Sequence, residues 1–368
     1  MMSEDVEQVD TPALLLDLDK MEQNIADISS FAREAGVAVR PHIKTHKSVE
    51  IAKRQIEAGA VGLTVAKVGE AEVMVAGGIK DIFIAYPLAA KAKLERVRKL
   101  MDQAKVTVAV DSVEQADILE ECFDPKSPLN VWIKVNSGLN RVGVEPNEEV
   151  VELAKYVRGL SSLHLDGIFT HAGHSYAASS REEVERIAFE EADAVVRSAE
   201  LCEDAGMEIA HRSIGSTPTF RIAGAVDGIT EIRPGNAVFY DMVQVGLGVA
   251  TKDQCALTVL SNVVSVKNDR IVIDAGSKTL ALDQGAHGNA SIAGHGYVVE
   301  HPEFVIARLS EEHGVIPVDG VVDVKLNDRL TIIPNHACVV ANLFETYLVH
   351  RDGKVIDEWK VDARGRLQ

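Results

Sequence analysis

Residues 37–47 read Val-Ala-Val-Arg-Pro-His-Ile-Lys-Thr-His-Lys, and this stretch sets the pattern on which the fold is built. Its apolar, β-branched start is typical of a short buried strand. The strand ends in several cationic or potentially cationic side chains, whose burial is costly unless an anion lies beside them. A lysine held there can have a lowered pKa and act as an amine nucleophile. A basic loop on a solvated face is the alternative that the stretch alone leaves open.

Short β-branched runs of this kind occur eight times, separated by amphipathic segments rich in Ala, Glu, Lys and Arg. We expect Gly36 to end the first helix and Asp111 to cap the helix after the fourth run. Eight such units favour an α/β fold, a (β/α)8 barrel, over an open doubly wound sheet. The expected strands are 37–44, 63–67, 81–86, 106–110, 131–135, 167–171, 209–215 and 231–235. The expected helices include 20–35, 89–103, 148–158 and 182–205.

After about residue 242 the helical periodicity fades, and short strands alternate with Gly, Asp and Asn turns such as Asn268-Asp269 and Asn327-Asp328. The expected strands here are 256–267, 270–274, 322–325 and 329–333. A further strand at 13–18 is one too many for the barrel. The sequence therefore predicts a barrel over residues 16–242, inserted into a mainly antiparallel β domain formed by residues 1–15 and 243–368.

Composition excludes several classes of protein. The length of 368 residues exceeds that of a single core, and the net charge of −18 argues against a nucleic-acid partner. No run approaches the roughly 20 apolar residues that span a bilayer, so no membrane association is expected. The acidic start, Met1 to Asp5, has no signal-peptide hydrophobic region and predicts a cytoplasmic location. The four cysteines include no CxxC pair, which argues against a disulfide framework.

Polar residues follow the expected strands, where barrel active sites lie. Gly215-Ser216-Thr217 follows the seventh strand and Gly235-Asn236 the eighth, and loops at these positions commonly bind phosphate through backbone N–H groups. Simple turns are the alternative. Arg141 follows the fifth strand, and its guanidinium suits either a cofactor heteroatom or a surface salt bridge.

Two further groups carry possible chemistry. His171, His174 and Tyr176 follow the sixth strand and are plausible acid and base groups. His336 and Cys338 lie at i and i+2, which places both side chains on one side of an extended segment and would suit a zinc ion. From spacing alone, a buried cysteine beside a hydrogen-bonded histidine is the better interpretation.

Taken together, these residues resemble the fold-type III pyridoxal-phosphate enzymes. More narrowly, they are similar to the family of D-threonine aldolases, eukaryotic-type D-serine dehydratases, and hydroxyaspartate aldolases and dehydratases. The resemblance runs from Asp10 to about Trp359 and implies an alanine-racemase-like barrel with a β domain. Its most specific motifs are Arg-Pro-His-x-Lys-x-His-Lys (40–47), Asn-Arg-x-Gly-Val (140–144), Val-Ile-Asp-Ala-Gly (272–276), Glu-His-Gly (312–314) and Pro-Asn-His-x-Cys (334–338).

The resemblance also implies roles for individual residues. Lys44, rather than Lys47, is the lysine that forms a Schiff base with pyridoxal phosphate, and Arg141 meets the pyridine nitrogen. The phosphate-binding residues are Gly215, Ser216, Thr217, Gly235 and Asn236, with Tyr176 and Tyr240 also at the cofactor site. His336 and Cys338 bind a divalent metal (zinc or manganese, possibly magnesium); in the family the second ligand is Asp in some aldolases and Cys in dehydratases. The catalytic base is His171, His174 or Lys44.

The activity implied is cleavage of a β-hydroxy-D-amino acid to glycine and an aldehyde, as in D-threonine aldolase. Dehydration of D-serine or 3-hydroxyaspartate to a 2-oxo acid and ammonia is the alternative, because it needs the same lysine, metal and hydroxyl group. A non-catalytic pyridoxal-phosphate carrier is a less favoured third interpretation, since such carriers have a similar barrel without a second domain. By analogy with relatives we expect a homodimer.

Overall fold

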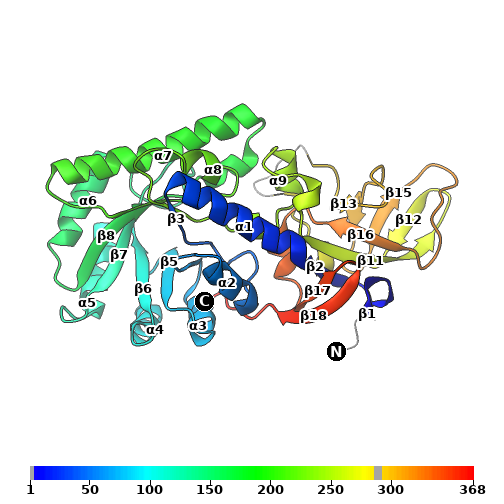
Figure 1. Ribbon diagram of the computed structural model, residues 1–368, viewed down its shortest axis with the longest axis horizontal. Coiled ribbons are helices and arrows are strands. Elements are labelled where there is room, and N and C mark those ends of the chain that lie inside the picture. Colours follow the sequence, from blue (N-terminus) through cyan, green and yellow to red (C-terminus); the bar gives the residue numbers. More distant parts are fainter. Residues whose placement is uncertain (1–3, 286–291) are drawn as a thin grey trace.

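The computed structural model describes residues 4–285 and 292–368, which form two sheets (Figure 1). The first sheet is parallel and has the strand order β3-β10-β9-β8-β7-β6-β5-β4. Its strands are β3 (Ala38–Val39), β4 (Leu63–Val65), β5 (Asp81–Pro87), β6 (Lys105–Val110), β7 (Leu129–Lys134), β8 (Leu163–Phe169), β9 (His211–Ile214) and β10 (Glu231–Ile232). Each lies within or close to one of the eight β-branched runs.

The parallel sheet closes on itself between its first strand and its last. The segment after β3 runs beside β4, where His42 and Thr64 form a parallel bridge. The Thr64 N–H donates to the Pro41 carbonyl at 2.9 Å, and the Val61 N–H donates to the Val39 carbonyl at 2.9 Å. The expected (β/α)8 barrel is therefore confirmed, and the segment that carries Lys44 forms part of its seam.

Helices connect the barrel strands, and α1 leads into the barrel from the other sheet (Figure 1). Gly36 ends α1 with φ of 70°, a left-handed conformation that glycine adopts without strain, as expected. The helices are α1 (Leu18–Ala35), α2 (Val49–Glu57), α3 (Val68–Ala76), α4 (Lys91–Met101), α5 (Val113–Cys122), α6 (Glu148–Arg158), α7 (Arg181–Asp204), α8 (Phe220–Ala223) and α9 (Met242–Gly246). Short 3-10 turns are η2 (Gly173–Ala177), η3 (Asn236–Val238) and η4 (Lys252–Gln254).

The expected cap at Asp111 is wrong by one residue. The helix α5 begins at Val113, so the Ser112 side chain accepts the Gln115 N–H at 3.2 Å and caps it. Asp111 lies one residue too early to reach that turn. Its carboxylate instead accepts the Gly143 N–H at 3.1 Å and ties down the loop that carries Arg141.

The second sheet is mostly antiparallel, as expected, with the order β1-β18-β17-β2-β11-β12-β15-β14, while β16 pairs with β11 and β13. The 13–18 run forms β2 in this sheet, between β11 and β17. The strands are β1 (Glu4–Asp5), β2 (Ala13–Asp17), β11 (Leu257–Val266), β12 (Arg270–Ile273), β13 (Tyr297–Val298), β14 (Arg308–Leu309), β15 (Gly314–Pro317), β16 (Arg329–Ile333), β17 (Thr346–Arg351) and β18 (Lys354–Lys360). Its helical pieces are η1 (Val6–Gln8), α10 (Ser277–Leu280) and α11 (Ala337–Ala341).

One strand expected in this domain does not form. Residues 322–325 are irregular: Val322 and Val324 pack against the core of this domain, but the backbone pairs with no described strand. Residues 1–3 and 286–291, which the sequence assigns to the antiparallel domain, lie outside the described residues. Within the described part of the chain, no helix is both long and apolar enough to cross a membrane.

The barrel interior holds buried charge beside an aromatic cluster. The rings of Phe83 and Trp132 lie 4.5 Å apart, and the Arg40 guanidinium lies over Trp132 at 5.6 Å. Arg40 donates from Nε to Glu231 at 2.9 Å and from Nη1 to Asp81. Because Arg40 is 4% exposed and Glu231 1%, each charge depends on the other for compensation.

We therefore expect Arg40→Ala to lower the free energy of unfolding by about 3–5 kcal/mol, since it leaves the Glu231 carboxylate buried without the cation that is hydrogen-bonded to it. Urea unfolding followed by circular dichroism measures this loss. The matched control is Arg98→Ala, which removes an exposed ion pair with Glu95 on α4 and should change the same free energy by no more than about 0.5 kcal/mol. Equal losses in the two variants would contradict the prediction.

Candidate active site

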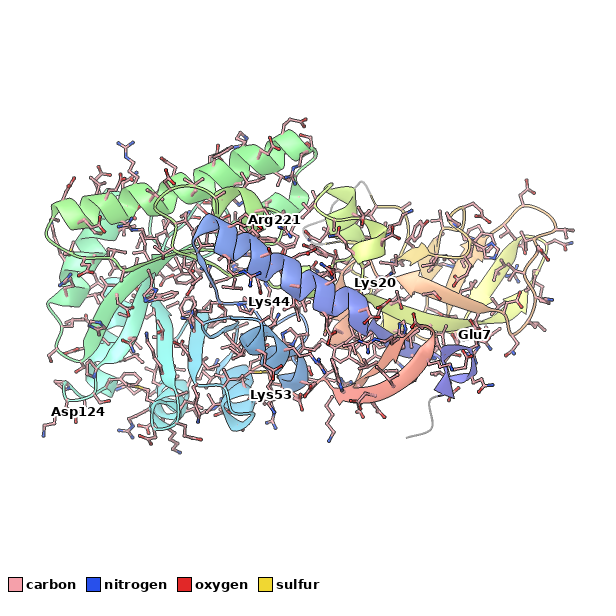
Figure 2. All side chains as sticks on the ribbon, viewed as in Figure 1. Glu7, Lys20, Lys44, Lys53, Asp124 and Arg221 are labelled. Atoms are coloured by element: carbon pink, nitrogen blue, oxygen red, sulfur yellow. The ribbon has the colours of Figure 1, made fainter. Side chains whose placement is uncertain are left out.

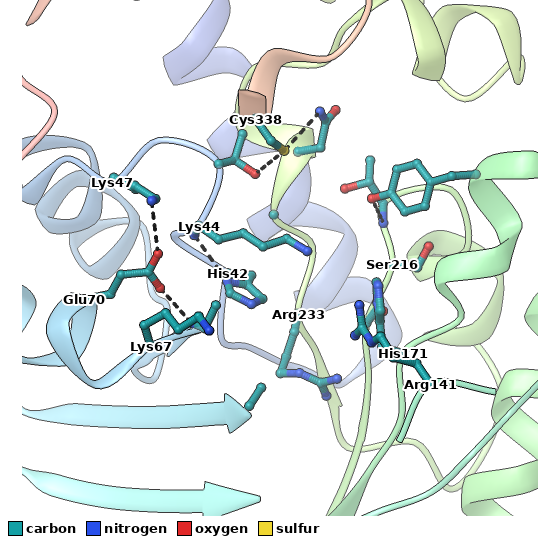
Figure 3. Close-up of a pocket in the computed structure, with 18 of the residues that line it drawn as sticks. His42, Lys44, Lys47, Lys67, Glu70, Arg141, His171, Ser216, Arg233 and Cys338 are labelled. Carbon is teal, nitrogen blue, oxygen red and sulfur yellow. Dashed lines mark hydrogen bonds and ion pairs between the residues drawn. The ribbon is translucent and has the colours of Figure 1, made fainter. Parts of the chain in front are cut away.

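A cavity of about 460 Å³ lies at the carboxyl ends of the barrel strands, where α11 of the second sheet approaches them (Figure 3). It collects most of the residues singled out by sequence. His174 and Tyr240 are not among its lining residues. The predicted residues that line it are Lys44, Arg141, His171, Tyr176, Gly215, Ser216, Thr217, Gly235, Asn236, His336 and Cys338.

Lys44 lies near the middle of the molecule, and its side chain extends into the cavity toward Ser216 and His171 (Figures 2 and 3). Burial lowers the pKa of its amine, and Arg141 lowers it further, while Cys338 and Glu70 act in the opposite direction. An amine with a lowered pKa is more often unprotonated and can attack a carbonyl carbon. The structure thus gives Lys44 the environment of a nucleophilic lysine.

Two histidines in the cavity differ in the ring nitrogen that carries the proton, so one can donate a hydrogen bond to a ligand and the other can accept one. Burial, with help from the Lys44 charge, lowers the pKa of both His42 and His171 well below the ordinary value, so both rings are neutral. The Lys44 backbone N–H donates to His42 Nδ1 at 3.2 Å, which leaves the ring proton of His42 on Nε2. His171 Nδ1 donates to the Gly215 carbonyl, which leaves a lone pair on its Nε2. The cavity therefore contains one imidazole that donates and one that accepts.

The two loops expected to bind phosphate form a cradle of backbone donors. Within the described residues, the N–H groups of Ser216, Gly235 and Asn236 have no hydrogen-bond acceptor, although all three residues are buried. A Cβ at Gly235 would lie 3.0 Å from the His42 carbonyl oxygen, so a larger residue would crowd the cradle. Unpaired buried donors of this kind suit a phosphate group. With Lys44 in the same cavity, these residues fit pyridoxal phosphate.

Arg141 remains available for a ligand, whereas Arg233 is already engaged. Arg233 donates to the Ser213 hydroxyl at 2.5 Å and to the Thr170 carbonyl. Arg141 also lines the cavity, and its guanidinium makes no hydrogen bond to any described residue. This difference favours Arg141 as the partner of a cofactor heteroatom, in keeping with the prediction from sequence.

The side chains of His336 and Cys338 both reach the cavity, but the backbone between them is not the extended segment expected from the sequence. His336 is the N-cap of α11 and Cys338 lies in its first turn, so the two are not neighbours on an extended segment. The side chains nevertheless interact: burial alone would lower the pKa of His336, but Cys338 and Asp283, which lies 2.7 Å from His336 Nδ1, raise it to about 11. Burial alone would raise the pKa of the Cys338 thiol, but His336 and Lys44 lower it below its ordinary value.

An imidazole held by a carboxylate, beside a cysteine whose pKa is lowered, is a donor pair that suits a divalent metal. The described residues contain no group of three or more His, Cys, Asp or Glu side chains that could hold a metal ion. His336 and Cys338 therefore fit two ligands of a metal whose remaining positions are filled by water or substrate.

Several residues of the cavity are not predicted from the sequence. Lys134 closes an apolar strand as Lys44 does, and this shared pattern should have identified it; burial, with Arg233, lowers its pKa to about 7. Glu70 accepts the Ala66 N–H at 2.7 Å and lies 3.6 Å from the Lys47 amine. Asp283 does not line the cavity but holds His336, and no local pattern marks it because its partner is 53 positions away in the sequence.

His174 and Tyr240 lie outside the cavity. A Cβ at Gly138 would lie 3.2 Å from the His174 ring, so this histidine packs against the loop after β7. Tyr240 is buried between η3 and α9, and its hydroxyl contacts Arg221. Their proposed roles at the cofactor remain predictions, and the geometry favours His171 over His174 as the base.

Two family models together match most of the chain. A model described as the alanine racemase N-terminal domain matches residues 16–243, and one described as a putative serine dehydratase domain matches residues 256–350. The D-threo-3-hydroxyaspartate dehydratase of Delftia sp. (strain HT23) is 34% identical over 94% of this chain and 96% of that protein.

Solved structures of proteins with related names are similar to this chain over nearly its whole length. D-threonine aldolase from Filomicrobium marinum is similar with a TM-score of 0.91 at 30% identity, covering 100% of this chain and 99% of that one. Two solved variants of D-threo-3-hydroxyaspartate dehydratase have TM-scores of 0.89 and 0.90 at 31% and 32% identity, covering 97% and 98% of this chain and 98% and 96% of theirs. One replaces a histidine with alanine; the other replaces a cysteine two positions later and is in the metal-free form.

We expect Lys44→Ala to abolish covalent attachment of pyridoxal phosphate, because Lys44 carries the cavity's nucleophilic amine. After borohydride reduction and denaturation, the cofactor's absorbance should no longer co-elute with the protein on gel filtration. In the control, Lys47→Ala, it should still co-elute, since the Lys47 amine is held by Asn342 at 2.8 Å and by Glu70. Retention of the absorbance in Lys44→Ala would make the assignment wrong.

The lowered pKa of Lys44 also predicts the pH dependence of cofactor attachment. Only the unprotonated amine attacks the aldehyde, so the attachment rate rises with pH and levels off above the pKa of this amine. We expect the midpoint of the rise to lie below the ordinary lysine value of 10.5. Stopped-flow absorbance of cofactor-free protein mixed with pyridoxal phosphate at a series of pH values measures this midpoint. A midpoint at or above the ordinary value would contradict the prediction.

Proposed function

Because the chain belongs to the fold-type III pyridoxal-phosphate family of D-threonine aldolases and of D-serine and 3-hydroxyaspartate dehydratases, we propose that it is a lyase of β-hydroxy-D-amino acids. We favour aldol cleavage of the D-threonine aldolase type, which yields glycine and an aldehyde. The substrate is a small molecule in either of the reactions considered below. The proposal includes pyridoxal phosphate on Lys44 and a divalent metal at His336 and Cys338.

One observation carries the proposal: the Lys44 amine, the phosphate cradle and the His336–Cys338 pair all line one cavity. When bound, pyridoxal phosphate accepts the electron pair released as a bond at the substrate's Cα breaks. A metal held by His336 and Cys338 would polarise the substrate's hydroxyl group as a Lewis acid. These two functions together match a substrate that carries both an amine and a β-hydroxyl.

The two neutral imidazoles supply the proton transfers. In aldol cleavage the β-hydroxyl loses its proton, and His171 Nε2 has the lone pair to accept it. The His42 Nε2–H is a donor in the same cavity and can hold a substrate oxygen. Both rings are fixed in these tautomers by hydrogen bonds to the backbone, so neither has to reorganise during the reaction.

Dehydration is the second candidate, and Cys338 favours it. The solved dehydratase variants replace a histidine and a cysteine two positions apart, the spacing of His336 and Cys338, and the cysteine variant is metal-free. Dehydration also needs a base for the α-proton and a donor for the departing hydroxyl, roles open to His171 and His42 respectively. A non-catalytic carrier is disfavoured, because the matches extend through the second domain.

Three finer assignments belong to the same proposal. The donor set of imidazole and thiolate favours zinc, with manganese as the alternative and magnesium as the least suited to sulfur. A homodimer is proposed by analogy with the fold family. The cytoplasmic location stays a prediction from the sequence.

The test offers D-threonine, D-serine and D-threo-3-hydroxyaspartate separately to the enzyme loaded with pyridoxal phosphate and Zn²⁺ or Mn²⁺. Glycine and acetaldehyde from D-threonine support the aldolase, whereas 2-oxo acid and ammonia from the other two support the dehydratase. L-Threonine is the control and should not react. We expect His171→Ala to lower kcat at least 100-fold with the cofactor still bound, since it removes the base. If none of the D-substrates reacts, the proposal fails.

A further inference from the structure

Asp241 lies directly after Tyr240 and has a fully buried carboxylate. One oxygen, Oδ1, accepts the Gln244 N–H at 3.1 Å and caps α9. The other, Oδ2, accepts the Asn236 side-chain N–H at 2.6 Å and the Ala337 backbone N–H at 2.9 Å. A single buried carboxylate thus satisfies three donors from three segments, and two of those donors share one oxygen.

The two donors on Oδ2 come from the two halves of the cavity. Asn236 belongs to the phosphate cradle at the end of the barrel. Ala337 lies in the second domain, between His336 and Cys338. Asp241 therefore connects the cradle with the segment that carries the predicted metal ligands, across 96 positions of sequence.

Other contacts tie the same two halves together without passing through Asp241. The Met242 and Val243 N–H groups donate to the carbonyls of Pro334 and Asn335 at 3.1 and 3.2 Å. On the opposite side, the Thr45 hydroxyl lies 3.1 Å from the Cys338 sulfur. Asn236 itself donates to the Cys338 sulfur in a long contact of 3.9 Å. The α9–α11 contact therefore survives the loss of the Oδ2 bonds, and what Oδ2 adds is the shorter link from Asn236 to the Ala337 backbone.

We propose that Asp241 is a positioning residue that couples cofactor binding to metal binding. This inference rests on the proposed function, because it needs both groups to bind in this cavity. A phosphate in the cradle fixes Asn236, and the shared Oδ2 then holds Ala337 and the two residues beside it in place for a metal. Coupling between sites is reciprocal, so the metal tightens cofactor binding by the same factor.

The variant Asp241→Asn separates this connection from helix capping. Asparagine caps helices as well as aspartate does, so its Oδ1 can still accept the Gln244 N–H. Its amide nitrogen then replaces Oδ2 and meets the Asn236 and Ala337 donors, with which it cannot form the same bonds. Asp17→Asn is the matched control: Asp17 caps α1 by accepting the Lys20 N–H at 3.1 Å and does not line the cavity.

The experiment measures the dissociation constant of Mn²⁺ from the electron paramagnetic resonance signal of the free ion. It uses the full-length protein with and without bound pyridoxal phosphate. In the wild type and in Asp17→Asn, we expect the cofactor to tighten Mn²⁺ binding about tenfold, within the usual range of coupling between sites. In Asp241→Asn the ratio should fall to about one. The dissociation constant of pyridoxal phosphate, measured with and without Mn²⁺, should show the same ratios.

Three outcomes overturn the inference. A ratio of one in the wild type shows that the sites are independent, and this measurement needs no variant to fold. A ratio that is unchanged in Asp241→Asn, with circular dichroism confirming its native fold, assigns the coupling to other residues. Lack of Mn²⁺ binding in every form contradicts the metal site of the proposed function and the coupling with it, whereas turnover without coupling contradicts the coupling alone.

Discussion

The burial of positive charge inside the barrel is the constraint on which this structure depends. Arg40, Lys134 and Arg233 are each no more than 5% exposed, a state that requires compensation. Part of it is internal, because Glu231 pairs with Arg40 at 2.9 Å and a second buried carboxylate, Glu191, attracts Arg233 and Lys134. The rest of the compensating negative charge has to come from the ligand in the cavity, and an anionic cofactor suits that role.

The same carboxylate, Glu191, shows how the helices outside the barrel shape its interior. It projects from α7 and accepts the N–H groups of Ala172 at 3.0 Å and Gly215 at 3.2 Å. These bonds hold the loop of His171 against the phosphate cradle, where the Gly215 carbonyl sets the His171 tautomer. The buried Glu191 carboxylate therefore helps to determine which nitrogen of His171 carries the proton and which can accept one.

Much of the fold follows from local sequence. The predictions of local structure that proved wrong have a common cause. The eight β-branched runs marked all eight barrel strands, because burial on both faces demands apolar residues whatever the neighbours. Residues 322–325 look like a strand but lack a partner sheet. The His336–Cys338 spacing was interpreted as an extended segment, although a helix begins between them. In each case the backbone conformation depended on contacts that are remote in sequence.

The sequence by itself determined the alternation of strands and helices, the lysine at the end of the first barrel strand and the glycine-containing loops after the last two. Each is a local property of a few adjacent residues. Only the tertiary structure decided that Asp283 holds His336, that Asp241 rather than Tyr240 links the phosphate cradle to Ala337, and which nitrogen of His171 carries the proton. Those features are hydrogen bonds between residues 53, 96 and 44 positions apart, and a buried donor or acceptor takes its partner from whatever the fold brings near.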